Sequence, residues 1–300
     1  MASLNNHMKI TRRAALSGAI LASSMFGKKK GMFEKPLGLQ LYTLRFVLPN
    51  DADNVLKTVA DIGYKEVEVI RKGMLEQKPL LDKYGLKAVS GHIETPILTG
   101  GPAWGGAQAG YTLDNAIEDS KKMGLSYMVA PYVQPKERGD LDYFRKFADD
   151  LNRAGEKISK AGMTLCYHNH AFEFKGVEGQ RVWDVMVERF DRKHVQFELD
   201  LFWVSVAGQV PAEVLKKLAG RVPLVHLKDK GWGTPTQFDE SVKPEAFKEV
   251  GAGTMEFAPI LRACEKAGVK HYFVEQDQTP KDPLASIRLS YTNLRNLKVS

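Results

Sequence analysis

Short hydrophobic runs alternate with longer amphipathic stretches along most of this 300-residue chain. The short runs are typical of strands buried on both faces, and the longer stretches carry apolar residues at helical spacing. This alternation predicts parallel strands joined by helices, which is an α/β fold. The predicted strands are 37–43, 64–70, 86–92, 125–131, 163–169, 194–200, 222–228 and 270–276.

Each predicted strand is followed by a predicted helix. Five of these helices end in a glycine directly before the next strand, as in Ile62-Gly63. Glycine is common at this position because the chain there takes a positive φ. Eight such units without a linker predict a (β/α)8 TIM barrel that forms a single domain over residues 31–300. The predicted helices are 53–62, 74–84, 113–123, 141–161, 182–189, 212–219, 258–267 and 283–297.

Residues 1–30 have a different pattern. Arg12 and Arg13 precede a short apolar stretch, residues 14–22, which small residues follow from Ser23. This order is typical of a twin-arginine export signal, and the stretch is too short to span a bilayer. The sequence therefore predicts an exported, periplasmic protein with no membrane span in its mature form. A disordered basic tail is the alternative.

The charge of the chain is concentrated in the same segment. The formal net charge is +7, and residues 1–30 hold six Lys or Arg and no acidic residue, which leaves +1 for the rest. A near-neutral body without a basic stripe is not expected to bind nucleic acid. The same balance argues against an endonuclease of the abasic-site type, which would need several metal ions and a basic groove.

Four predicted strands in the second half of the chain carry a potential metal-binding side chain at or near their carboxyl end. The carboxyl ends of parallel strands converge at one face of a barrel, so these side chains are expected to meet there and hold one divalent cation. A set with two imidazoles and a single glutamate favours Mn²⁺, Co²⁺ or Zn²⁺ over Mg²⁺. The four predicted ligands are His168, Asp200, His226 and Glu275.

Alternate residues of a barrel strand point into the lumen. Counting back from Asp200 places Glu198 inside, and counting on from His226 places Lys228 inside. Such a polar layer needs a cation or a polyhydroxylated ligand to satisfy it. The second and third strands are expected to add Glu66, Glu68, His92 and Glu94 to it.

Several motifs taken together resemble the xylose isomerase-like TIM-barrel family, also called sugar phosphate isomerases/epimerases. They follow one another in order over about residues 37–297. The motifs are GLQLYTLR at 38–45, IGYKEVE at 62–68, YHNHAFEF at 167–174, LDLFW at 199–203, HLKD at 226–229, VGAGTMEF at 250–257 and VEQD at 274–277.

The resemblance implies one divalent metal held by residues of the fifth to eighth strands. Asp200, His226 and Glu275 match the last three positions, whereas His168 stands where many members have glutamate. Members with both glutamates resemble two-base enzymes that move a proton beside a carbonyl. With one glutamate replaced, the catalytic candidates are Glu275, His170 and Lys228.

Two of these assignments have alternatives. His170 is an alternative to His168 as the metal ligand, and Lys228 is expected either to contact substrate or to pair with Asp229 or Glu198.

Other residues are candidates for binding substrate. Trp203 replaces a histidine seen in ketose epimerases, and an indole there would stack on a sugar face. Trp104, in a glycine-rich loop, is a candidate lid or oligomer contact, and a homo-oligomer is left open. The remaining candidates are Glu68, His92, Tyr42 and Arg45, the last of which has a loop salt bridge as its alternative.

The predicted function is that of a metal-dependent isomerase or epimerase acting on a small carbohydrate. Phosphorylated sugars are held inside the cell, so an exported enzyme is expected to act on an unphosphorylated sugar. A single-sided base suits elimination at least as well as epimerisation, so a lyase acting on 3-keto-glycosides is the alternative. A non-catalytic sugar-binding barrel is the third.

Overall fold

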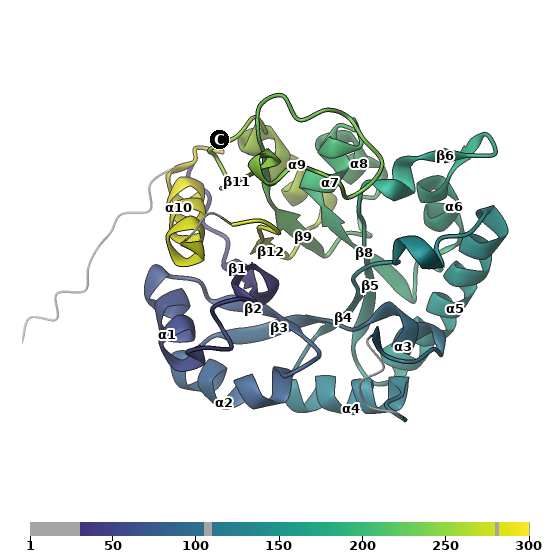
Figure 1. Cartoon of the computed structure of the whole chain (residues 1–300), viewed down its shortest axis with the longest axis horizontal. Coiled ribbons are helices and arrows are strands. Elements are labelled where there is room, and N and C mark those ends of the chain that lie inside the picture. Colours follow the sequence, from purple (N-terminus) through teal and green to yellow (C-terminus); the bar gives the residue numbers. More distant parts are fainter. Residues whose placement is uncertain (1–30, 105–109, 280–281, 300) are drawn as a thin grey trace, which may run out of the picture. The chain divides into compact units, whose positions relative to one another are not determined.

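The computed structural model describes residues 31–104, 110–279 and 282–299. Their centre is a closed barrel of eight parallel strands, with helices around the outside (Figure 1). All eight predicted strands are confirmed, and so is the TIM-barrel fold. In barrel order the strands are β1 (Leu37–Gln40), β12 (His271–Val274), β9 (Leu224–Leu227), β8 (Val195–Asp200), β5 (Thr164–His168), β4 (Tyr127–Ala130), β3 (Lys87–His92) and β2 (Glu66–Ile70).

The predicted helices are also confirmed, each with both ends within two residues of the prediction. The glycines that follow them have the expected positive φ, for example 65° at Gly85 and 81° at Gly124. The helices are α1 (Ala52–Ile62), α2 (Met74–Tyr84), α4 (Leu113–Met123), α5 (Leu141–Lys160), α6 (Val182–Arg189), α8 (Pro211–Lys217), α9 (Phe257–Ala267) and α10 (Pro283–Asn296).

Several short elements that the sequence pattern did not predict follow the carboxyl ends of the strands. β1 ends at Gln40, where the chain turns into a 3-10 helix. The side chain of Gln40 accepts a hydrogen bond from the backbone N–H of Tyr42 and caps this helix. The others are α3 (Thr95–Thr99), α7 (Leu201–Val206), the hairpin of β6 (Gly176–Val177) with β7 (Gln180–Arg181), and the pair β10 (Asp229–Lys230) and β11 (Phe247–Lys248).

The lower part of the barrel lumen is closed by an apolar plug. Phe273 of β12 packs there with Tyr127, Cys166 and three aliphatic side chains, and the polar layer lies on the side of the strands' carboxyl ends. Gly38 of β1 makes room for Phe273, because a Cβ at Gly38 would overlap the phenyl ring. Cys166 and Cys264 are both buried and do not form a disulfide.

Two sequence predictions concern membranes and export. Among the described residues, no helix has the length and hydrophobicity needed to cross a membrane. The twin-arginine pair lies in residues 1–30, outside the described residues, so the export signal and the boundary at residue 30 stay predictions.

Gly38→Ala is expected to destabilise the protein, because the added methyl group overpacks the plug against Phe273. We expect the free energy of unfolding, measured by urea titration, to fall by about 1–3 kcal/mol. Gly176→Ala is the matched control, since a Cβ at Gly176 meets nothing within 4 Å. Equal stability of the two variants would contradict this packing.

Candidate metal centre and active site

The four predicted metal ligands come together at the carboxyl-terminal mouth of the barrel. His168 ends β5, Asp200 ends β8, His226 lies in β9, and Glu275 directly follows β12. All four are buried, and each offers a ligand atom within 4.8 Å of the others. The register pairs Asp200 with His226, so these two neighbours lie side by side. We call these four residues the ligand cluster.

Single atoms of the ligand cluster face one another. Asp200 Oδ2 lies 3.7 Å from His168 Nε2 and 4.0 Å from His226 Nδ1, and Glu275 Oε2 lies 2.7 Å from His226 Nδ1. The other oxygen of Asp200 accepts the backbone N–H of Trp203 at 2.9 Å and so caps α7. Imidazole nitrogens and carboxylate oxygens are donors that divalent transition ions accept. The cluster therefore fits such an ion by chemistry and by spacing.

Lys228 lies in the lumen, as strand parity predicted, and is buried at the mouth. Its Nζ lies 2.6 Å from Glu275, 2.9 Å from Asp200 and 2.9 Å from Asp277. It pairs with neither of the acids named for it from the sequence. Asp229 instead accepts backbone N–H groups of the 251–255 loop. Lys228 thus offsets the charge of three carboxylates at the mouth.

A second polar layer lies next to the ligand cluster inside the lumen. Glu68 and Glu198 are fully buried there, and one oxygen of each lies 3.0 Å from His92 Nε2. Gln40 donates to Glu68 at 2.6 Å. Strand parity placed Glu66 in the same layer, which is wrong: Glu66 lies at the start of β2 and pairs with His271.

The charges of the ligand cluster act on one another. Burial alone would raise the pKa of Glu275, but Lys228 and His226 hold it well below its ordinary value. Glu275 is therefore ionised near pH 7. Burial lowers the pKa of His168, which is therefore neutral near pH 7. Burial raises the pKa of Asp200 against the opposing charges of Lys228 and His226. Three carboxylates outweigh burial and raise the pKa of His226, so an incoming cation must displace its proton.

The same balance operates in the second layer. Burial alone would lower the pKa of His92, but Glu68 and Glu198 raise it to about 10. His92 is therefore an imidazolium between two carboxylates near neutral pH.

A cavity of about 490 Å³ opens above the ligand cluster and reaches His168 and Glu275. Aromatic side chains supply much of its wall, which is typical of sites that bind small organic molecules. Of the sequence candidates, its wall contains Tyr42, His92, Trp104, His168, His170, Trp203 and Glu275.

Three of the catalytic and substrate-binding candidates do not line this cavity. Glu68 is below it, in the second layer, and Lys228 is covered by its carboxylate partners. Arg45 lies at the rim, where it donates to the backbone oxygens of Tyr42 and Asp277 instead of forming the salt bridge considered from the sequence. Substrate binding by Glu68 and Arg45 stays a prediction, and their contacts favour supporting roles.

Residues that the sequence analysis did not select, among them Tyr132, complete the surroundings of His170. The ring of His170 lies between those of Tyr132 and Trp203, whose centroids are 4.7 and 5.3 Å away. Its backbone N–H donates to Glu173, a buried carboxyl whose pKa burial raises to about 7. Tyr132 and Phe247 carry no periodic signal, whereas Asp277 and Glu173 belong to quoted motifs and could have been chosen from them.

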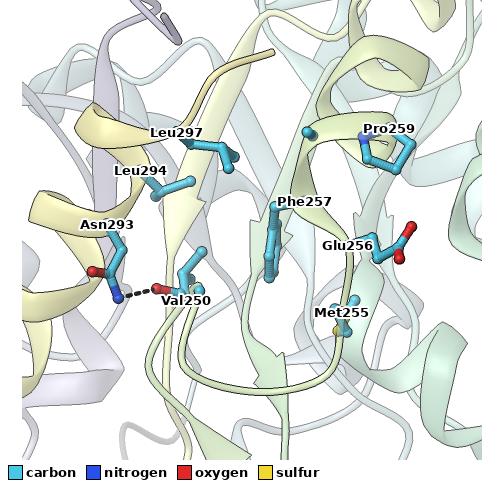
Figure 2. Close-up of a pocket in the computed structure, with 10 residues that line it drawn as sticks. Val250, Met255, Glu256, Phe257, Pro259, Asn293, Leu294 and Leu297 are labelled. Carbon is cyan, nitrogen blue, oxygen red and sulfur yellow. Dashed lines mark hydrogen bonds between the residues drawn. The ribbon is translucent and has the colours of Figure 1, made fainter.

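A second cavity, of about 430 Å³, lies outside the barrel between α9 and α10 (Figure 2). Phe257, Leu294 and Leu297 give it an apolar wall, and Asn293 donates to the backbone oxygen of Val250 at its edge. Its lining includes none of the predicted site residues. The ligand cluster and its cavity are therefore the candidate active site.

The fold and the ligand cluster define a class of TIM barrel with a polar mouth whose side chains fit a divalent metal ion. The chain belongs to the Xylose isomerase-like TIM barrel family, which it matches over residues 56–295. The family inferred from the motifs is thereby confirmed.

Relatives with assigned activities match parts of the chain. An inosose dehydratase from Geobacillus thermodenitrificans is 31% identical over 140 residues, which are 44% of this chain and 46% of that protein. The chain thus spans about half the length of that relative. An inosose dehydratase from Clostridium perfringens is 25% identical over 239 residues, which are 73% of this chain and 68% of that protein.

A solved structure is similar over nearly the whole barrel. It is a sugar phosphate isomerase/epimerase from Parabacteroides distasonis, with a TM-score of 0.72 and 25% identity. The similarity covers 89% of this chain and 99% of that one.

Asp200→Asn is expected to remove bound metal. Asparagine still caps α7 but lacks the anionic oxygen that faces the two histidines. We expect elemental analysis to show a fall from about one divalent ion per chain to near zero. Asp277→Asn is the control, because Asp277 also pairs with Lys228 but lies outside the cluster. Full metal occupancy in the Asp200 variant would exclude it from the ligand set.

Proposed function

We propose that this chain is a divalent-metal-dependent enzyme that removes a proton from the carbon next to a carbonyl of an unphosphorylated sugar, in an isomerase- or epimerase-type reaction. The observation that carries the proposal is the buried ligand cluster at the foot of the 490 Å³ cavity. A divalent ion bound there would act as a Lewis acid on the carbonyl oxygen and acidify the neighbouring C–H. Mn²⁺, Co²⁺ and Zn²⁺ suit the donor set better than Mg²⁺.

Glu275 is the proposed base. It belongs to the ligand cluster and also lies on the cavity wall. Its depressed pKa keeps it ionised, so it can accept a proton from a substrate in the cavity. Lys228 holds this carboxylate in place at 2.6 Å and offsets its charge.

His170 and Trp203 are proposed to act from the wall of the cavity. The His170 ring is neutral, because burial lowers its pKa well below the ordinary value, and Nδ1 has no hydrogen-bond partner among the described residues. It can exchange a proton with a sugar hydroxyl or carbon. Trp203 offers an indole beside it for stacking on a sugar face.

The charges of the wall support an unphosphorylated substrate. The charged side chains that line the cavity are one lysine, the imidazolium of His92 and four acids. Two of the acids are already paired with arginines, Glu94 with Arg71 and Glu240 with Arg138. A phosphate dianion would meet mostly carboxylates, whereas a neutral sugar can hydrogen-bond to them.

Elimination is the second candidate outcome, and two observations favour it. The ligand cluster has one glutamate, with His168 in the place of the other. Relatives that match parts of this chain are named inosose dehydratases, and dehydration of a keto-cyclitol begins with the same proton removal. The electron pair of the broken C–H bond would then expel the leaving group from the next carbon, and that group would take up a proton. A 3-keto-glycoside would lose its aglycone in this way.

Proton NMR in D₂O of the metal-loaded protein tests the proposal with ketohexoses, an inosose and a 3-keto-glucoside. Deuterium entering an intact ketose would support isomerisation or epimerisation. Loss of the proton next to the carbonyl together with water or aglycone would support elimination. No exchange with any of them would favour the non-catalytic sugar-binding barrel and contradict the proposal.

Glu275→Gln is expected to lower the turnover number by about 10²–10⁴-fold, the usual contribution of a general base. Turnover is expressed per bound metal ion, because the amide that replaces the carboxylate is a weaker ligand, as in Asp200→Asn. The matched control is Glu240→Gln, a wall carboxylate that pairs with Arg138. Unchanged turnover in the Glu275 variant would exclude it as the base.

We also propose that the chain is exported by the twin-arginine route, on the sequence of residues 1–30. Arg12→Lys with Arg13→Lys keeps the charge and should abolish export in a host with this pathway. Cell fractionation measures the result, and Lys28→Arg with Lys29→Arg is the control. Undiminished export of the first variant would contradict the signal.

A further inference from the structure

Glu68 and Glu198 lie directly beside the two histidines of the ligand cluster, on the side that faces the barrel interior. Both carboxylates are fully buried. His226 Nε2 lies 2.7 Å from Glu68 and 3.3 Å from Glu198. His168 Nδ1 lies 3.1 Å from Glu198. Each histidine therefore has one nitrogen against a buried carboxylate and the other in the ligand cluster.

This division of the nitrogens fixes the tautomers. A neutral imidazole carries one N–H and one lone pair, and an N–H is favoured wherever a carboxylate accepts it. At His168 the carboxylate contact is on Nδ1. At His226 both nitrogens face a carboxylate at 2.7 Å, Nε2 that of Glu68 and Nδ1 that of Glu275. An ion held by Glu275 would occupy the Nδ1 side and leave the N–H to Glu68. The lone pairs then fall on His168 Nε2 and His226 Nδ1, which are the nitrogens nearest to Asp200.

We propose that Glu68 and Glu198 are positioning residues for the metal ligands, which hold His168 as the Nδ1–H tautomer and His226 as the Nε2–H tautomer. The inference rests on the proposed metal centre and adds a function for two residues that cannot touch substrate. A carboxylate behind a metal-binding imidazole orients the ring and makes its free nitrogen a stronger donor.

The two carboxylates are themselves held in place. Gln40 donates to Glu68 at 2.6 Å, and His92 lies 3.0 Å from both carboxylates. Gln40 and His92 belong to β1 and β3, and the two carboxylates to β2 and β8, so the layer connects four strands of the barrel to the two histidines. A fixed acceptor gives a fixed ring orientation.

A second cation within this inner layer is the competing explanation. His92, His168, Glu198 and His226 also offer ligand atoms within 4.8 Å of one another. His168 and His226 belong to both groups, so two ions at once would require each ring to lose its last N–H proton. Neutral imidazole binds one metal through one nitrogen. A single ion leaves both rings neutral, and in the ligand cluster that ion would also face the cavity, which His168 and Glu275 line.

The first test is the affinity for Zn²⁺, measured by competition with a chelator. Glu198→Gln and Glu68→Gln should each raise the dissociation constant by about 10- to 100-fold. Glu66→Gln is the matched control: Glu66 is a carboxylate of the same strand, paired with His271 at 2.8 Å and away from the cluster. It should change affinity by no more than about twofold. Wild-type affinity in both test variants would overturn the proposal.

The second test needs no variant. Nitrogen-15 NMR of the Zn²⁺-loaded wild-type protein should show His168 with its proton on Nδ1 and His226 with its proton on Nε2. The opposite tautomer at either ring would overturn the proposal, and so would two Zn²⁺ ions per chain with the second lost in Glu198→Gln. Both tests measure metal and proton positions and not turnover. A protein with these tautomers but no deuterium exchange would refute the proposed enzyme and keep the inference.

Discussion

The need to neutralise buried carboxylates governs the polar half of this barrel. Glu68, Glu198, Asp200 and Glu275 are almost completely removed from water, and Asp277 is largely so. An unpaired carboxylate in such a place costs several kcal/mol or takes up a proton. The protein meets this constraint with Lys228 and His92, which are cations in the lumen, and with histidines that can also bind metal. Every proposed role at the mouth follows from how these charges are shared.

The two cations divide the lumen into two layers. Lys228 offsets the charge at the mouth, where Asp200, Glu275 and Asp277 surround its Nζ. His92 offsets the charge of Glu68 and Glu198 in the inner layer. His168 and His226 lie between the layers and contact both, so the inner layer can set the chemistry of the mouth although its two carboxylates do not line the cavity.

The sequence predicted the fold almost completely, because alternation and helix-ending glycines repeat along the whole chain. It missed elements such as α3 and α7, which are too short to show a period. The ligand cluster was predictable because strand ends converge in any parallel barrel. Strand parity, however, separates inside from outside and carries no information on depth. Glu66 and Glu68 both point inward, yet they lie at different levels, on either side of a register shift between Val67 and Glu68.

Loops set a different limit on prediction. Tyr132 and Phe247 reach the cavity from segments that have no periodic pattern, and only the fold brings them to His170 and Trp203. Arg45 follows a strand end by a few residues, but a 3-10 turn directs it to the rim. Residues of this kind are found from coordinates and not from spacing.

Asp200 has two structural duties that its two oxygens divide between them. One oxygen accepts the N–H of Trp203 and starts α7, and the other faces the histidines. The carboxylate therefore cannot turn toward an incoming ion without moving the first turn of α7, to which the indole wall of the cavity is attached. A metal ion bound at the ligand cluster would therefore also act on the position of the aromatic wall, and a change in the fluorescence of Trp203 on loading is the expected sign of that link.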